Sequence, residues 1–399
     1  MILVLAPYVP HPPQNGGRIR SRVLLDALAG HDVHLVAPVV DDNERARARE
    51  LAGELGLTFH ELAAAPAGGL GPPAVGRKLA HWARGRSELF ARRWGERSAG
   101  AVRGLFAELD PDLVVADSSF VLPLLPAGRV PLLLFLHNLE SDIFARPDTQ
   151  RRGASERWSR RFEAFGMARE ERRALRRAAL TVTVSERDAA LVRALAGDVA
   201  VAIVPNSVDL DRLPLQPRAN VGPPRLLFVG GLDYPPNREA VAELVERHLP
   251  ALRAAHPGLT VRLVGRDDAG FARALAARTA GIEACGLVDD VLPHYRQSDA
   301  AYLPIRSGGG TRIKILEAWA VGLPVVATAV AAEGLGAVDD VQLRTFDSVA
   351  QGVEALGAVL GGQGAALAAS ARTFVEQRYS HAAAIAALRT AIADLLADH

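Results

Sequence analysis

The 399-residue sequence has very little cysteine and very little lysine. Its one cysteine, Cys285, excludes an internal disulfide and a metal site built from several cysteines. Lysine occurs only at Lys78 and Lys314, so arginine supplies nearly all of the 46 basic residues. We attribute this bias to GC-rich coding. A lysine kept against such a bias deserves a functional explanation.

Long apolar runs and an excess of either charge are also missing. The longest apolar stretches, 130–136 and 320–332, fall short of the roughly 20 residues that span a bilayer. The first ten residues, MILVLAPYVP, have no basic leader, so we expect no signal peptide and a cytoplasmic protein. The 46 basic and 45 acidic residues nearly cancel, which argues against a nucleic-acid partner.

The chain is too long for one hydrophobic core, and its apolar runs predict two α/β domains. Continuous apolar runs that alternate with helical segments are typical of parallel sheets covered on both faces. The expected strands are 2–6, 33–37, 113–116, 131–136, 180–184 and 201–204, followed by 225–229, 260–264, 299–303 and 324–328. Among the expected helices is 237–253. The prediction is therefore two doubly wound, Rossmann-like parallel sheets.

Residues 207–224 are rich in proline and lack periodicity, so we interpret them as a linker. It separates an N-terminal domain, 1–206, from a C-terminal domain, 225–380. An Ala/Leu-rich helix follows, over about 381–399. Since ligands bind at the carboxyl edge of such sheets, we expect both domains to face one bound molecule.

The strongest motif is the segment 302–322, YLPIRSGGGTRIKILEAWAVG. An expected strand leads into Gly308, Gly309 and Gly310, and Thr311 is the expected N-cap of a helix. Glycines allow backbone N–H groups to approach a phosphate closely, and the helix N-terminus adds positive partial charge. This combination predicts a diphosphate-binding turn.

Charged residues follow the glycines. Arg312 and Lys314 lie in the first helical turn, where a cation is unfavourable unless an anion shares the space. Glu317, further along the helix, is placed to accept hydrogen bonds from sugar hydroxyls such as those of a ribose. The alternative is a solvated glycine turn, which leaves one of the two lysines unexplained.

Two further candidates follow strands of the N-terminal domain. Gly16 and Gly17 precede an expected helix and are a second candidate for the diphosphate, although a Gly-Gly turn is often only structural. His137 and Glu140 follow the apolar strand PLLLFL. In a group-transfer site, His137 could hydrogen-bond a transferred sugar or the developing charge, and Glu140 could orient an acceptor hydroxyl or take its proton. Alternatively, the residues after this strand only cap a loop.

The segments 203–213, 228–237 and 308–328 resemble those of the family-4 retaining glycosyltransferases (glycosyl transferases group 1), which have the GT-B fold. The resemblance implies a nucleotide-sugar donor, such as a UDP-sugar, held by the C-terminal domain. It also implies a hydroxyl acceptor on the N-terminal domain, transfer with retention and no required metal ion. The terminal helix is implied to cross back to the first domain.

The resemblance assigns residues too. It places Glu317 on the ribose and Gly286, Leu287 and Val288 against the nucleotide base. His137 resembles the cleft histidine of the family's N-terminal domain.

The sequence also departs from the family pattern. The first glutamate of the family's E-x7-E motif is replaced by Gly309. Two cations that many relatives place on the diphosphate are replaced by Gly231 and Pro236. We infer that the positive charge has moved to Arg312 and Lys314.

Other functions remain open at this stage. A hydrolysing nucleotide-sugar epimerase shares the architecture, and a non-catalytic sugar-nucleotide-binding protein is compatible with the half-empty E-x7-E motif. A phosphorylase would need a Schiff-base lysine, and Lys314 already has an electrostatic role. The acceptor is undefined: a glycan, a glycolipid or a small metabolite. Either a monomer or a homodimer fits.

Two basic stretches with interleaved aromatic residues, 77–103 and 146–187, have two interpretations. They are solvated helix faces, or they contact anionic lipid at the inner face of the membrane.

Overall fold

The computed structural model describes residues 1–13, 16–63, 81–94, 96–145, 154–217, 222–307 and 313–397. The chain divides into two compact units. Unit 1 contains Met1–Pro205 and Ala384–His399, and unit 2 contains Asn206–Ala383. Part of the expected linker is thus integral to unit 2, where Val208 forms a parallel bridge with Ser380.

Unit 1 is built on a seven-stranded sheet with the order β3-β2-β1-β4-β5-β6-β7, in which every pairing is parallel. The strands are β1 (Ile2–Leu5), β2 (Val33–Val39), β3 (Thr58–Ala63), β4 (Leu113–Asp117), β5 (Leu132–Phe135), β6 (Leu180–Thr183) and β7 (Val201–Ile203). Ile2 and Val4 join one hydrophobic cluster, and Leu3 joins another. Both faces are therefore buried, which explains the continuous apolar runs.

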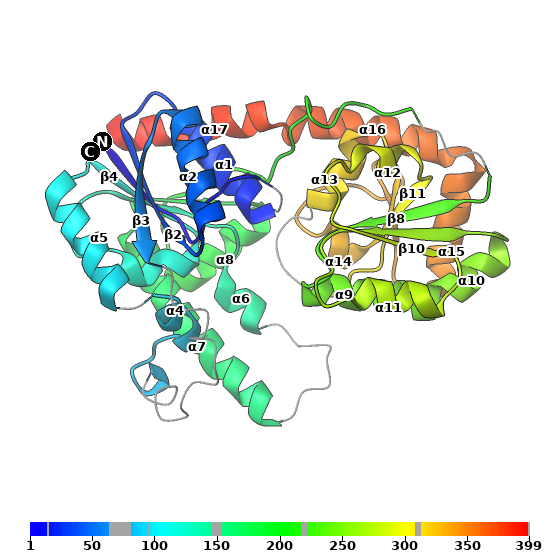
Figure 1. Ribbon diagram of the computed structural model, residues 1–399, viewed down its shortest axis with the longest axis horizontal. Helices are drawn as coiled ribbons and strands as arrows, with labels where there is room; N and C mark the ends of the chain where they lie inside the picture. Colours follow the sequence, from blue (N-terminus) through cyan, green and yellow to red (C-terminus); the bar gives the residue numbers. More distant parts are fainter. Residues whose placement is uncertain are drawn as a thin grey trace. The chain divides into compact units, whose positions relative to one another are not determined.

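Helices cover both faces of this sheet (Figure 1). They are α1 (Gly16–Ala27), α2 (Asp42–Leu55), α4 (Glu88–Arg93), α5 (Glu96–Leu109), α6 (Glu140–Ala145), α7 (Ala154–Arg177), α8 (Glu186–Ala196) and α17 (His381–Ala397), with a 3₁₀ turn at Ser119–Leu124. The C-terminal α17 packs on unit 1 beside α1: Leu388 and Ile392 join the core, and Arg389 donates to the Asp26 carbonyl.

Unit 2 has a six-stranded parallel sheet with the order β10-β9-β8-β11-β12-β13. The strands are β8 (Arg225–Val229), β9 (Thr260–Val264), β10 (Ile282–Gly286), β11 (Ala300–Leu303), β12 (Val325–Thr328) and β13 (Arg344–Phe346). The helices are α9 (Pro235–Glu243), α10 (Leu249–Ala255), α11 (Phe271–Arg278), α12 (Leu292–Arg296), α13 (Ile313–Ala320), α14 (Ala329–Ala332), α15 (Val349–Ala358) and α16 (Gly364–Arg378). The α/β prediction of two doubly wound sheets is confirmed.

One expected helix has a different form. The segment predicted as a single helix over 237–253 is α9 and α10 joined by a π-helical turn, Leu244–His248. This turn places His248 inside the unit, fully buried. Hydrophobic periodicity does not reveal such an inserted residue.

Among the described residues, the stretch Val349–Arg378 is long and apolar enough to span a membrane by length and composition alone. Gly362 interrupts its helical geometry with a φ of 123°. Leu356 and Leu367, on either side, belong to the hydrophobic core of unit 2. We therefore interpret the stretch as a pair of core helices.

Candidate functional site

In both sheets the strand order reverses beside the first strand. Doubly wound sheets bind their ligands at this switch point. In unit 1 this point lies between β1 and β4, and in unit 2 between β8 and β11. The predicted polar residues follow the carboxyl ends of these strands or their neighbours. Each unit therefore presents its own candidate site.

In unit 2, folding brings Lys314 to the end of β8. Its Nζ donates to Asn237 Oδ1 at 2.6 Å and lies 4.3 Å from the centre of the Phe228 ring. Asn237 Nδ2 in turn donates to the Gly231 carbonyl at 2.7 Å. A side chain at Gly230 would bring its Cβ within 2.8 Å of Lys314 Nζ. The lysine thus lies beside the turn after β8, where Gly231 and Pro236 replace the two cations that the family resemblance leads us to expect.

Helix α9 also binds the residues that precede the glycine-rich segment. Glu239 accepts a hydrogen bond from Ser307 Oγ at 2.9 Å, and Glu243 accepts one from Arg306 Nε at 3.1 Å. Together with the Asn237–Lys314 bond, these contacts hold both flanks of residues 308–312. The predicted phosphate ligands Gly309, Gly310, Thr311 and Arg312 themselves lie outside the described residues.

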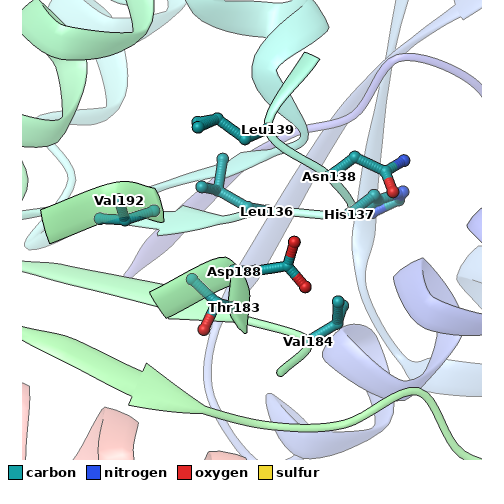
Figure 2. Close-up of a pocket in the computed structure, with 8 residues that line it drawn as sticks. All are labelled: Leu136, His137, Asn138, Leu139, Thr183, Val184, Asp188 and Val192. Carbon is teal, nitrogen blue, oxygen red and sulfur yellow. The ribbon is translucent and has the colours of Figure 1, made fainter. Parts of the chain in front are cut away.

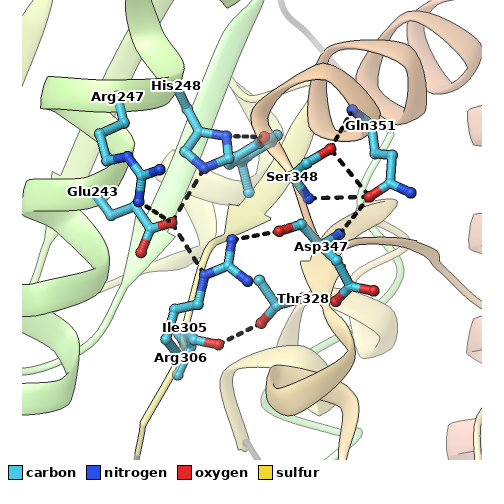
Figure 3. Close-up of polar contacts among 10 residues, drawn as sticks. Glu243, Arg247, His248, Ile305, Arg306, Thr328, Asp347, Ser348 and Gln351 are labelled. Atoms are coloured by element: carbon cyan, nitrogen blue, oxygen red, sulfur yellow. Dashed lines mark hydrogen bonds and ion pairs between the residues drawn. The ribbon is translucent and has the colours of Figure 1, made fainter. Parts of the chain in front are cut away.

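A polar network anchors these contacts in the core of unit 2 (Figure 3). His248 Nδ1 lies 2.8 Å from the Tyr302 hydroxyl, and its Nε2 lies 3.5 Å from Glu243 Oε1. Burial lowers the pKa of His248. Arg306 Nη2 donates to the Asp347 carbonyl at 2.8 Å. The segment that leads to the glycines is therefore rigidly held.

Glu317 lies one turn beyond Lys314 on α13. The Tyr295 hydroxyl donates to its Oε2 at 3.3 Å, and Tyr295 is buried. Desolvation raises the pKa of Glu317 to about 7, although Tyr295 and Lys314 oppose the shift. When ionised, the carboxylate has lone pairs beyond the one that the Tyr295 hydroxyl uses, and hydroxyl donors can bind to them.

The predicted base-binding turn follows β10. Gly286 has a φ of 70°, which favours glycine. Leu287 is 61% exposed, whereas Val288 packs partly against the core. An exposed leucine at a strand's carboxyl end is suited to contact a planar base, and this role stays a prediction.

In unit 1, His137 follows β5 and is bonded to a carboxylate that the sequence reasoning missed. Its Nε2 donates to Asp117 Oδ1 at 2.6 Å, and Asp117, the last residue of β4, is 1% exposed. The Tyr8 hydroxyl lies 3.4 Å from His137 Nδ1. Because Nε2 donates its hydrogen to Asp117, Nδ1 is the nitrogen left to accept a hydrogen bond, and the Tyr8 hydroxyl lies beside it. The sequence signal that could have identified Asp117 is its place as the polar last residue of the apolar strand LVVAD.

His137 borders a shallow hollow at the carboxyl ends of β5 and β6 (Figure 2). Asn138, Thr183 and Asp188 also line it. The hollow is open to solvent and encloses no appreciable volume. Within unit 1, the hollow alone does not enclose a sugar.

Glu140 begins α6 and is buried beside a second carboxylate. Glu171, on α7, accepts hydrogen bonds from Ser119 Oγ and from the backbone N–H groups of Glu140 and Ser141. Burial, followed by repulsion from Glu171, raises the pKa of Glu140 to about 8. At neutral pH Glu140 is therefore mostly protonated, which favours hydrogen-bond donation over the base role that we considered.

Gly16 and Gly17 form the first residues of α1, and the Gly17 carbonyl accepts a hydrogen bond from Ser21. Their contact with a diphosphate stays a prediction. One turn on, the buried Arg20 donates to the carbonyls of Leu136 and Val204. It ties α1 to the ends of β5 and β7, and burial lowers its pKa to about 9.

Metal-binding clusters are not found among the described residues: no three His, Cys, Asp or Glu side chains there are arranged to hold an ion.

Sequence profiles of two families match the chain. "Glycosyltransferase Family 4" matches residues 23–212, and "Glycosyl transferases group 1" matches residues 223–375. No curated protein sequence matches significantly.

Solved structures with the same fold cover nearly the whole chain. Sucrose-phosphate synthase from Thermosynechococcus elongatus has a TM-score of 0.72 at 16% identity, with 100% of this chain and 99% of that chain covered. Anabaena HepE in complex with UDP and glucose has a TM-score of 0.61 at 15% identity, covering 100% and 99%. A TarM variant from S. aureus, in complex with UDP and other ligands, has a TM-score of 0.67 at 8% identity, covering 99% of each chain. The two family matches and the paired sheets together establish that this chain belongs to the family-4 (group 1) glycosyltransferases with the GT-B fold.

Proposed function

We propose that this glycosyltransferase moves a sugar from a UDP-sugar to a hydroxyl acceptor, with retention at the anomeric carbon. One observation carries the proposal: Lys314 Nζ is held beside Gly230 at the end of β8. The family resemblance implies a cation in the turn after β8 that neutralises the diphosphate, and in this proposal Lys314 supplies the missing charge from α13. HepE structures that contain UDP or UDP-glucose support the choice of nucleotide.

The residues of unit 2 bind the donor in this proposal. Lys314 stabilises the departing diphosphate, aided by the N-terminus of α13 and by Arg312. Glu317 accepts hydrogen bonds from the ribose, and the base lies against the 286–288 turn. The cations carry the charge stabilisation, so we expect transfer without a metal ion.

The residues of unit 1 bind the acceptor and the reacting sugar. His137 accepts a hydrogen bond from a sugar hydroxyl at Nδ1, and Asp117 stabilises the charge if the proton follows. Protonated Glu140 donates to the acceptor side. The acceptor class is a glycan, a glycolipid or a small metabolite.

The test compares UDP, GDP and TDP sugars by thermal shift, since a ligand that binds the native state raises Tm. We expect the largest rise with a UDP-sugar. The best donor is then incubated with and without a panel of hydroxyl acceptors, and UDP release is followed together with the anomeric configuration of the product. A requirement for acceptor supports transfer. Equal UDP release from donor alone would instead identify a hydrolysing epimerase, and binding without turnover would identify a non-catalytic protein.

A further inference from the structure

Helix α7 exposes three large aromatic side chains along one face. Trp158 is 59% exposed, Phe162 45% and Phe165 61%. Their spacing of four and three residues places them on one side of the helix. Arg161 lies on the same side, with its guanidinium 5.9 Å from the centre of the Trp158 ring. We call Trp158, Arg161, Phe162 and Phe165 the α7 aromatic face.

The opposite side of α7 already provides its packing. Ala164, Met167 and Leu175 are buried. At Gly166 the backbone of Arg86 comes so close that a Cβ would lie within 2.6 Å of it. The buried side of the helix therefore holds it in unit 1. In Figure 1 the N-terminal half of α7 extends beyond the sheet of unit 1.

The solvent-exposed side of α7 has a larger excess of basic residues than the helix as a whole. The helix has eight arginines and four glutamates. Glu163 and Glu171 are buried and accept hydrogen bonds, and Glu170 accepts one from the Ser87 N–H. Glu156 is the one exposed acid among the α7 residues whose burial is described. The inward glutamates leave arginines to dominate the solvent side.

The aromatic residues are also partly ordered by their neighbours. Phe162 stacks on Trp82 with ring centres 5.0 Å apart, and Trp82 Nε1 donates to Glu163 at 2.9 Å. Fixed aromatic rings flanked by arginines are suited to the boundary between lipid headgroups and acyl chains. A purely solvated face has no need of three exposed aromatic residues.

We propose that the α7 aromatic face docks the enzyme on membranes that contain anionic phospholipids. The rings enter the interface, and the surrounding arginines attract the lipid phosphates. This inference concerns where the enzyme works and is independent of the proposed donor and acceptor.

The experiment uses the full-length protein and flotation with vesicles of phosphatidylcholine alone or with 30 mol% phosphatidylglycerol. The variant is Trp158→Ala/Phe165→Ala. The matched control is Val338→Ala/Val341→Ala, which removes two exposed apolar side chains from unit 2. We expect wild type and control to bind the anionic vesicles and the α7 variant to lose at least about tenfold in partitioning. Equal Tm and equal UDP binding show that the variant is folded.

Binding should weaken with salt and be lower for phosphatidylcholine alone. The proposal is overturned if wild type does not float with anionic vesicles or if the α7 variant floats equally well. A dimer that becomes a monomer in the variant, measured by light scattering without vesicle binding, would assign the face to a second copy of the chain. Binding to an anionic polysaccharide but not to vesicles would also overturn it.

Discussion

The two sheets of this protein share a strand order, but their carboxyl edges carry different chemistry. In unit 2, Asn237 and Glu243 of one helix hold the segments around a single lysine. In unit 1, the corresponding edge presents His137 on a buried aspartate, with Glu140, whose pKa is raised by burial, three residues further on. One topology thus places a lysine at the carboxyl edge of one sheet and a histidine–carboxylate pair at that of the other, and we propose that they bind a leaving group and handle a proton. The strand ends determine where a ligand binds, and the side chains determine which ligand.

Removal of Lys314 should produce the largest loss, and only in donor binding. In Lys314→Ala we expect the Kd for UDP to rise roughly a hundredfold, because an uncompensated diphosphate costs about 2–5 kcal/mol. Titration calorimetry measures this. Lys314→Arg should retain most of the affinity, and Arg278→Ala, an exposed cation on α11, should retain all of it. Unchanged UDP binding in Lys314→Ala would disprove the relocated charge.

The corresponding test in unit 1 is Asp117→Asn. The amide no longer fixes the Nε2 proton of His137, so we expect kcat to fall about thirtyfold while the KM for the donor stays within twofold. Steady-state kinetics separate the two constants. Asp112→Asn, at the other end of β4, is the control because Asp112 is exposed and pairs with the N-terminus. A rise in donor KM without loss of kcat would mean that His137 only holds the donor sugar and takes no part in the transfer step.

The pH dependence of UDP binding tests the role of Glu317 in unit 2. Its pKa of about 7 means that wild type gains the ionised acceptor as pH rises from 6 to 8. At pH 8 we expect Glu317→Gln to bind UDP about tenfold more weakly than wild type, with the difference shrinking to about twofold at pH 6. The ratio of the two Kd values cancels the titration of UDP itself. A ratio that is constant across pH would argue against contact between Glu317 and the ribose.

The smallest effect concerns the stability of unit 1. Burial raises the pKa of Glu140 from 4.5 to about 8, so the folded protein retains a proton that the unfolded chain releases in this window. Stability therefore falls as pH rises from about 4.5 to 8. Glu140→Gln should raise Tm by about 3 °C at pH 8.5 and by less than about 1 °C at pH 5. Thermal unfolding with the exposed Glu354→Gln as control measures it. An equal shift at both pH values would contradict the buried titration.

Strands that the sequence did not predict lie at the edges of the sheets. β3, β10 and β13 are edge strands, whereas every strand expected from an apolar run is present. β3 has one buried residue and β10 also has one, so neither shows a continuous apolar run. Edge strands have a neighbour on one side and bury less surface, which weakens their sequence signal.

Glycine, charge and strand ends pointed to Lys314 and His137 in the sequence, and the structure places both at strand ends, while their roles stay predictions. Asp117 and Asn237 were missed because they are ordinary residues in the sequence and gain their roles from partners 20 and 77 positions away.

Periodicity was enough to predict two doubly wound sheets, because a buried parallel strand needs a local apolar run. The diphosphate-binding role of the glycine-rich segment stays a prediction, since residues 308–312 lie outside the described residues. Folding alone decided which side chain meets which. It brought Lys314 to Gly230 and paired His137 Nε2 with Asp117. It also left three aromatic rings of α7 exposed to solvent. These outcomes depend on contacts between distant segments, which no local pattern encodes.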